Sequence, residues 1–130
     1  MIVVDASALL EMLLEGSKGA RISERVLAEG ETLHAPHLLD LEVLQVLRRY
    51  TLSGDLTNER AGQALEDLMD LRILRYPHVP FMGRIWELRK NMTAYDAAYI
   101  ALAEVLPATF VTCDQRVATA GGHSARVELF

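Results

Sequence analysis

The sequence is poor in cysteine, in lysine and in long apolar runs. Its single cysteine, Cys113, excludes an intramolecular disulfide, which is consistent with a reducing compartment. No stretch approaches the roughly 18 uncharged apolar residues that a membrane span needs, and the start, MIVVDASALL, lacks the basic segment of a signal peptide. We therefore expect a cytoplasmic protein that does not associate with a membrane.

Long runs of glycine, serine, proline or like charge are also absent, so no linker divides the chain. At 130 residues and 51% hydrophobic residues, we expect one globular domain spanning 1–130. The net charge of −5 argues against a surface that is basic throughout, but local basic patches remain possible. Only Lys18 and Lys90 are lysines, and the other basic residues are arginines, whose planar fork suits contact with phosphate or carboxylate.

Short strands alternate with helical segments along the chain. Residues 2–4 form a β-branched run without polar alternation, which is typical of a strand buried on both faces. The pattern predicts a three-layer α/β/α sandwich with a central, mainly parallel sheet, whose ligands would bind beyond the carboxyl ends of the strands. Further strands are expected at 32–35, 72–76, 108–112 and, at an edge, 126–129, and helices at about 7–15, 20–28, 37–52, 57–70, 81–91 and 94–106, with a short helix after 114.

Four of the acidic residues stand where solvated charge is not expected. Asp5 and Asp114 directly follow buried strands, whereas Glu42 and Asp96 interrupt apolar helices. If these helices pack near the carboxyl edge of the sheet, all four carboxylates can converge on one pocket. Their repulsion would then require protonation or a cation, and an all-oxygen cluster suits Mg²⁺ or Mn²⁺. Such a site can activate water and stabilise the charge that develops on a phosphodiester.

Two of these acids also have simpler interpretations. Asp96 follows Thr93 by three residues, the spacing of a capping box in which the acid reaches back to a free backbone N–H. Glu42 could form a structural ion pair with Arg48, Arg49 or another basic residue.

Several motifs together give the chain a family resemblance. They are Asp5-Ala-Ser7 after an apolar strand, a helical Glu42, the run TAYDAAYIALA at 93–103 and the run TCDQR at 112–116. Over essentially the whole chain they resemble a PIN domain of the VapC toxin type. The resemblance implies a Mg²⁺- or Mn²⁺-dependent endoribonuclease that cuts structured cellular RNA, often transfer RNA. It also implies a small VapB-like antitoxin whose tail blocks the acidic pocket, and a homodimer.

The resemblance also implies roles for individual residues. Asp5 and Asp96 would be the principal metal ligands, with Asp114 and Glu42 completing the site through metal, water or general-base contacts. No acid of the pattern is missing.

Three supporting residues remain ambiguous. Ser7 and Thr112 match positions where a hydroxyl orients an acid or a metal-bound water, but Ser7 could be only an N-cap and Thr112 only a strand-forming residue. Arg116 could steer a phosphate or neutralise the acidic cluster.

Other candidate residues favour structural roles. Tyr95 and Tyr99, four residues apart, are expected to pack in the core rather than to form a platform for RNA bases. Arg84, Arg89 and Lys90 could contact an RNA backbone, although a solvated helix face explains them equally well.

Two rival functions can be weighed from the sequence. Asp5 after a first strand also fits phosphoryl transfer through an aspartyl-phosphate, but Ser7 stands where a second acid would be wanted and lysine is scarce. The other rival is a catalytically inactive PIN-like module that only binds RNA or protein. The intact acids argue against it, because a binding surface has no need to concentrate repelling charge.

Overall fold

The computed structural model describes all 130 residues and contains one five-stranded parallel sheet. The strand order is β3-β2-β1-β4-β5, so β1 lies in the centre, and its three residues are fully buried because both faces of the sheet are covered. The strands are β1 (Ile2–Val4), β2 (Leu33–Pro36), β3 (Ile73–Tyr76), β4 (Thr109–Thr112) and β5 (Arg126–Leu129).

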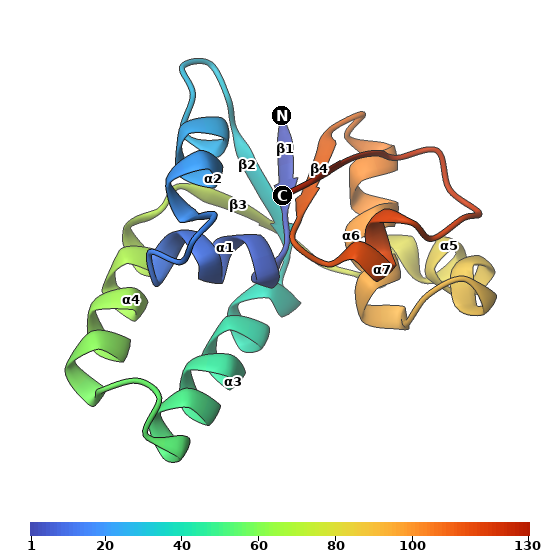
Figure 1. Ribbon diagram of the computed structural model, residues 1–130. Helices are drawn as coiled ribbons and strands as arrows, with labels where there is room; N and C mark the ends of the chain where they lie inside the picture. The colour runs from blue at the N-terminus through green and yellow to red at the C-terminus, as the bar shows by residue number, and fades with distance from the viewer.

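Helices cover the two faces of this sheet. They are α1 (Ala6–Leu13), α2 (Gly19–Val26), α3 (Leu38–Ser53), α4 (Asn58–Asp70), α5 (Met82–Glu87), α6 (Ala94–Val105) and α7 (Gln115–Ala118), with two short 3₁₀ helices, η1 (Val79–Phe81) and η2 (Leu88–Lys90). Figure 1 shows α1 to α4 on one side of the strands and α5 and α6 on the other, with α6 packed on β1, β2 and β4. This arrangement confirms the three-layer α/β/α sandwich. No helix has the length and apolar content needed to cross a membrane.

Two expected helices differ in detail from the observed ones. The first begins at Ala6 because Asp5, and not Ser7, is its N-cap and accepts the backbone N–H of Ala8. The helix expected over 81–91 is instead divided into η1, α5 and η2. Leu88, at the start of η2, is almost completely buried, and this tight turn leads the chain to the start of α6.

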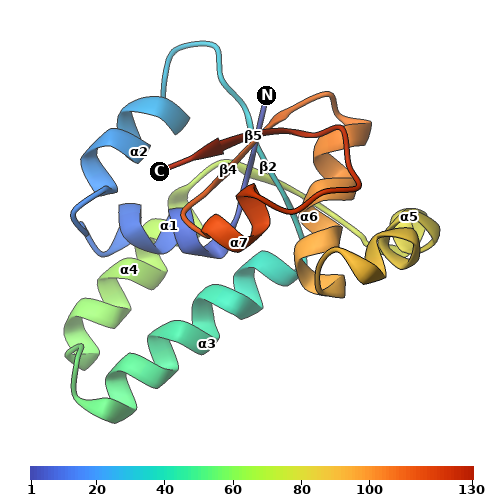
Figure 2. The ribbon, with the colours of Figure 1, turned by 45° about the vertical axis from the view of Figure 1, so that its right-hand side comes forward.

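The topology places four chain segments at one edge of the sheet. Strands β1 and β4 are neighbours, with Val4 paired to Val111, so the residues that follow them emerge side by side. Helix α3 begins directly after β2, the other neighbour of β1. Figures 1 and 2 both show the starts of α1, α3 and α6 near this edge, with α7 following β4.

Candidate active site

Three hydrogen bonds hold the carboxylate of Asp5 in place. The Ser7 hydroxyl and the Ala8 backbone N–H both donate to Asp5 Oδ1, at 2.7 and 2.9 Å. The Thr112 hydroxyl donates to Asp5 Oδ2 at 2.5 Å. Burial raises the pKa of Asp5, and these three hydrogen bonds oppose that rise. Asp5 is therefore fixed in place as an acceptor.

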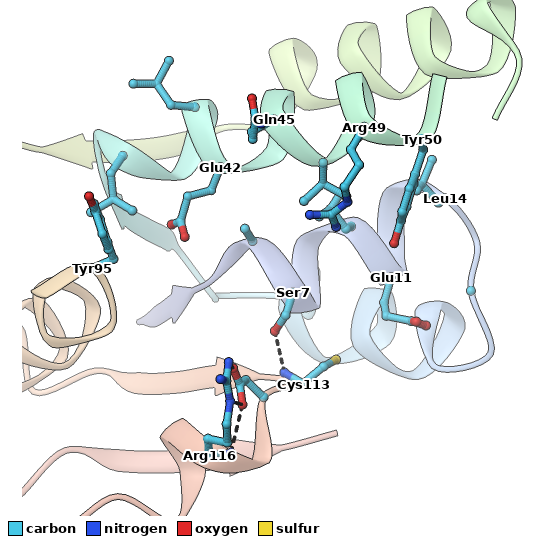
Figure 3. A pocket seen from close by; sticks show the side chains of 17 residues that line it. Ser7, Glu11, Leu14, Glu42, Gln45, Arg49, Tyr50, Tyr95, Cys113 and Arg116 are labelled. Atoms are coloured by element: carbon cyan, nitrogen blue, oxygen red, sulfur yellow. Dashed lines mark hydrogen bonds and ion pairs between the residues drawn. The ribbon is translucent and has the colours of Figure 1, made fainter. Parts of the chain in front are cut away.

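The two hydroxyls also connect Asp5 to the turn after β4. Ser7 Oγ accepts the Cys113 N–H, a bond drawn in Figure 3, and Thr112 Oγ1 accepts the Asp114 N–H, both at 2.9 Å. Each hydroxyl has a single proton. Because a backbone N–H occupies an acceptor position on each oxygen, that proton is directed at Asp5.

Glu42 is positioned by a residue that the sequence did not suggest. The Tyr99 hydroxyl, on a side chain that is almost fully buried, donates to Glu42 Oε1 at 2.6 Å. Burial raises the pKa of Glu42, and the hydrogen bond from Tyr99 opposes the rise. Glu42 forms no ion pair, so the alternative pairing with Arg48 or Arg49 is wrong.

Asp96 differs from these two acids because its carboxylate accepts no hydrogen bond. The Thr93 hydroxyl caps α6 by accepting the Asp96 backbone N–H at 3.2 Å, but the Asp96 carboxylate makes no return bond. The capping-box interpretation is therefore only half correct. Burial raises the pKa of Asp96, and the charge of Asp114 adds to the rise.

Asp114 is paired with Arg116 at the start of α7. Asp114 Oδ1 accepts the Arg116 backbone N–H at 2.9 Å, and the Arg116 guanidinium donates to Oδ1 at 3.3 Å and to Oδ2 at 2.8 Å. This contact lowers the pKa of Asp114. The Arg116 side chain is 87% exposed, so the pair faces water and can separate at little cost.

The charges of these acids affect one another's pKa values, although the acids come from separate elements. The charge of Asp96 raises the pKa values of Asp5 and Glu42, and Asp5 also raises that of Glu42. An all-oxygen set of this kind matches the ligands that hard divalent cations prefer. No three of the protein's histidine, cysteine, aspartate and glutamate side chains are arranged as they would be around a metal ion, so the cluster offers a cation such as Mg²⁺ at most two of these ligands at once, with water completing its coordination.

A cavity of about 870 Å³ opens beside this cluster (Figure 3). Glu42, Asp114, Ser7 and Arg116 line it, whereas Asp5 and Asp96 do not. Ser7 links Asp5 to the cavity, because Ser7 lines the cavity and its hydroxyl donates to Asp5 Oδ1.

Two further residues of this cavity were not expected there. Arg49 extends from α3 and makes no ion pair or hydrogen bond within the protein. Tyr95 lines the cavity and is 67% exposed, so its expected place in the core is wrong. Tyr99 does pack in the core, against Phe110, as expected of it. The two tyrosines differ in burial because Tyr99 packs against the sheet, whereas Tyr95 lies in the first turn of α6 and does not.

The three basic residues near α5, Arg84, Arg89 and Lys90, differ in whether they pair with acids. Arg84 donates to both carboxylate oxygens of Glu104 at 2.9 Å, to Glu87 and to the backbone oxygen of Gly122, and the pKa of Glu104 is lowered to about 2. Arg84 is therefore structural. Arg89 and Lys90 form no ion pair with an acid.

Comparisons with known proteins agree with this architecture. Residues 2–122 match the PIN domain. Ribonuclease VapC9 of Mycobacterium tuberculosis is 44% identical over 121 residues, covering 93% of this chain and 91% of the relative. Ribonuclease VapC12 of the same organism is 38% identical over 129 residues, covering 99% and 98%. The solved structure of VapBC2 from Rickettsia felis, bound to a DNA fragment from their promoter, matches with a TM-score of 0.70 at 13% identity, covering 99% of this chain and 98% of that chain, and shows the same fold. The chain therefore belongs to the PIN-domain family and, within it, to the VapC-type ribonucleases.

Proposed function

We propose that the protein is a toxin that hydrolyses phosphodiester bonds in structured RNA, such as transfer RNA, with Mg²⁺ or Mn²⁺ as cofactor. Its catalytic and metal-binding residues would be Asp5, Glu42, Asp96 and Asp114. The observation that carries the proposal is electrostatic. The carboxylates that follow β1 and β4 and those on α3 and α6 lie close enough to affect one another's ionisation beside one cavity.

A divalent cation would relieve the repulsion within this set. Asp5 and Asp96 are the proposed principal ligands, the first because it is already fixed and the second because its carboxylate is free. Glu42 and Asp114 would complete the set, Asp114 after its separation from Arg116. A bound cation would supply a Lewis acid that stabilises the charge developing on the phosphodiester.

The chain's own residues would orient the groups that react. Ser7 and Thr112 keep the Asp5 oxygens in place, and Tyr99 does the same for Glu42. The raised pKa of Glu42 suits a group that accepts a proton from the attacking water near neutral pH. Arg116, at the rim of the cavity, can exchange its carboxylate partner for a phosphate of the RNA.

We further propose a VapB-like antitoxin and a second copy of the chain as partners, with action in the cytoplasm, where cellular RNA is found. The solved neighbour from Rickettsia felis is itself a VapBC pair, which supports the first partner. Exposed leucines on α3, Leu44 and Leu52, offer apolar surface for a homodimer.

The direct test is cleavage of total RNA by the purified protein. With Mg²⁺ or Mn²⁺ we expect discrete fragments, and we expect EDTA or Asp96→Asn to reduce cleavage by about 100-fold or more, since loss of a ligand should exceed the effect of losing an outer hydrogen-bond partner. Asp70→Asn, the same change at an exposed position at the end of α4, should have no effect. Cleavage that survives both EDTA and Asp96→Asn would remove the metal proposal, and RNA binding without cleavage would indicate a binding module.

A further inference from the structure

Arg49 is the one cation of the active-site cavity that has no carboxylate partner. Arg49 and Arg116 are the two basic residues that line the cavity, and Arg116 is bonded to Asp114. Arg49 forms no ion pair, and Figure 3 shows its side chain extending from α3 into the cavity. The Tyr50 ring, whose centre lies 5.5 Å from the guanidinium carbon, is neutral and does not occupy its N–H donors. Arg49 therefore offers a full positive charge and free donors to a ligand.

The acid on the neighbouring helix α1 does not neutralise this charge. Glu11 lines the same cavity, but its Oε2 accepts the Lys18 backbone N–H at 3.1 Å. The Glu11 carboxylate also occupies the space beside Gly16, where an added Cβ would overlap it. Figure 3 accordingly shows the Glu11 carboxylate turned away from Arg49. Glu11 serves the turn after α1, and the charge of Arg49 stays unpaired for that reason.

Arg49 lies on the same side of α3 as Glu42, two helical turns further along. Glu42, Gln45 and Arg49, at spacings of three and four, share the face of α3 that lines the cavity. Seven residues of helix place the Cα atoms of Glu42 and Arg49 about 10 Å apart along the axis. The residues of α3 that line the cavity beyond Glu42 carry no negative charge; they are Gln45, Val46, Arg49 and Tyr50. A ligand with several phosphates can therefore place one phosphate at the acids and another at Arg49.

We propose that Arg49 binds a backbone phosphate of the RNA next to the bond that is cut, so that the strand lies along α3. The inference rests on the proposed ribonuclease function and adds a second contact point for its substrate. The contact is to the backbone, so it positions the strand without selecting a base. A phosphodiester chain fits better than a protein carboxylate, because only the chain also supplies a phosphate for the acidic end of the cavity.

Salt-dependent binding tests the phosphate contact without cleavage. Full-length protein carrying Asp96→Asn is titrated into a labelled single-stranded RNA of mixed sequence, and anisotropy is read at several KCl concentrations. Adding Arg49→Ala should weaken binding by about 5-fold and lower the slope of log Kd against log salt by about 0.7, the share of one phosphate contact on a single strand. Arg48→Ala removes the same charge from the next position, outside this cavity, and should leave the slope unchanged. An unchanged slope in Arg49→Ala, or RNA that does not bind at all, would overturn the proposal.

Cleavage kinetics separate a neighbouring phosphate from the one that reacts. On RNA that the unchanged protein cleaves, Arg49→Ala should raise KM by about 5-fold with little change in kcat, because the contact is the same in the ground state and the transition state. Arg49→Lys keeps the charge and should recover part of the loss. A normal KM, or a fall in kcat alone, would overturn the proposed contact while leaving the ribonuclease proposal intact. A protein that cleaves no RNA would instead remove the proposed function, and the salt-dependent titration would still decide whether Arg49 binds a phosphate.

Discussion

Asp5 and Asp96 belong to one cluster of acids, yet the protein treats them in opposite ways. Asp5 accepts three hydrogen bonds, from Ser7, Ala8 and Thr112, whereas the Asp96 carboxylate accepts none. Burial raises both pKa values. The fold itself therefore sets the position of Asp5, while Asp96 remains available for a ligand.

Two arginine–carboxylate pairs show the same contrast. Arg84 binds Glu104, which is only 14% exposed in its side chain, and also contacts Glu87 and Gly122. Arg116 binds only Asp114, and it does so from a side chain that water surrounds. An arginine that is shared among several partners, one of them largely buried, stabilises the fold, whereas a single exposed pair contributes little and can open.

The strongest test of the contrast is to remove one of the bonds that fix Asp5. Thr112→Val keeps the shape of a fully buried side chain but deletes both the donor to Asp5 and the acceptor of the Asp114 N–H. We expect cleavage to fall about 10- to 100-fold, as for other partners of metal ligands, and the free energy of unfolding to fall by about 1–3 kcal/mol. RNA cleavage and urea unfolding measure the two effects.

Thr109→Val is the matched control for this change. Thr109 begins the same strand, and its side chain makes no hydrogen bond. Its replacement should leave cleavage unchanged. If Thr112→Val cleaved RNA as fast as the unchanged protein, the fixed position of Asp5 would have no catalytic value.

The sequence singled out four acids as candidates for the site, but not the groups that orient them. Asp5, Glu42, Asp96 and Asp114 were detected because each breaks an apolar pattern or ends a strand. The bond from Tyr99 to Glu42 joins residues 57 positions apart and depends on how α6 packs against α3. No local pattern carries that information.

The lack of tertiary information in local patterns also explains why Tyr95 was wrongly expected in the core. Tyr95 and Tyr99 share a helical spacing of four, which suggested one buried face. The exposed one lies in the first turn of α6, beyond the part of the helix that the sheet covers. The fold class could be predicted because it follows from the order of strands and helices, whereas the reach of each packing surface depends on tertiary contacts.

Replacing Asp96 should also have a smaller effect, on the stability of the metal-free protein. Burial raises the pKa of Asp96 from its ordinary value of 3.8, so the folded protein binds a proton that the unfolded chain releases between the two values. Stability from this group is present below the lower value and is lost as pH rises through the higher one. At pH 7 Asp96→Asn should therefore stabilise the metal-free protein by about 0.5–1 kcal/mol, a small amount because the group is partly exposed to water. Thermal unfolding in EDTA should show this gain shrinking as pH falls towards 4.

Asp114→Asn makes the same chemical change as Asp96→Asn and should change the stability in the opposite direction. Arg116 lowers the pKa of Asp114, so the ionised form stabilises the folded state, and its neutralisation should decrease stability at pH 7. Asparagine still caps a helix, so the effect of charge is isolated. Equal shifts in both variants would mean that Asp96 and Asp114 do not differ in their electrostatic surroundings.

The smallest expected effect concerns Glu42, which lies between the two extremes because it accepts one hydrogen bond. Tyr99→Phe removes that donor from a buried position without changing the packing of the ring on Phe110. The carboxylate loses stabilisation, so the pKa of Glu42 should rise further. If ionised Glu42 is needed for cleavage, the acidic limb of the pH–rate profile should move to higher pH, with a loss of only a few-fold at neutral pH. Tyr76→Phe, which removes a hydroxyl bonded to His34 instead, should leave that limb where it is. An acidic limb that stays in place in Tyr99→Phe would show that Glu42 contributes charge to the cluster but does not itself titrate in the rate-limiting step.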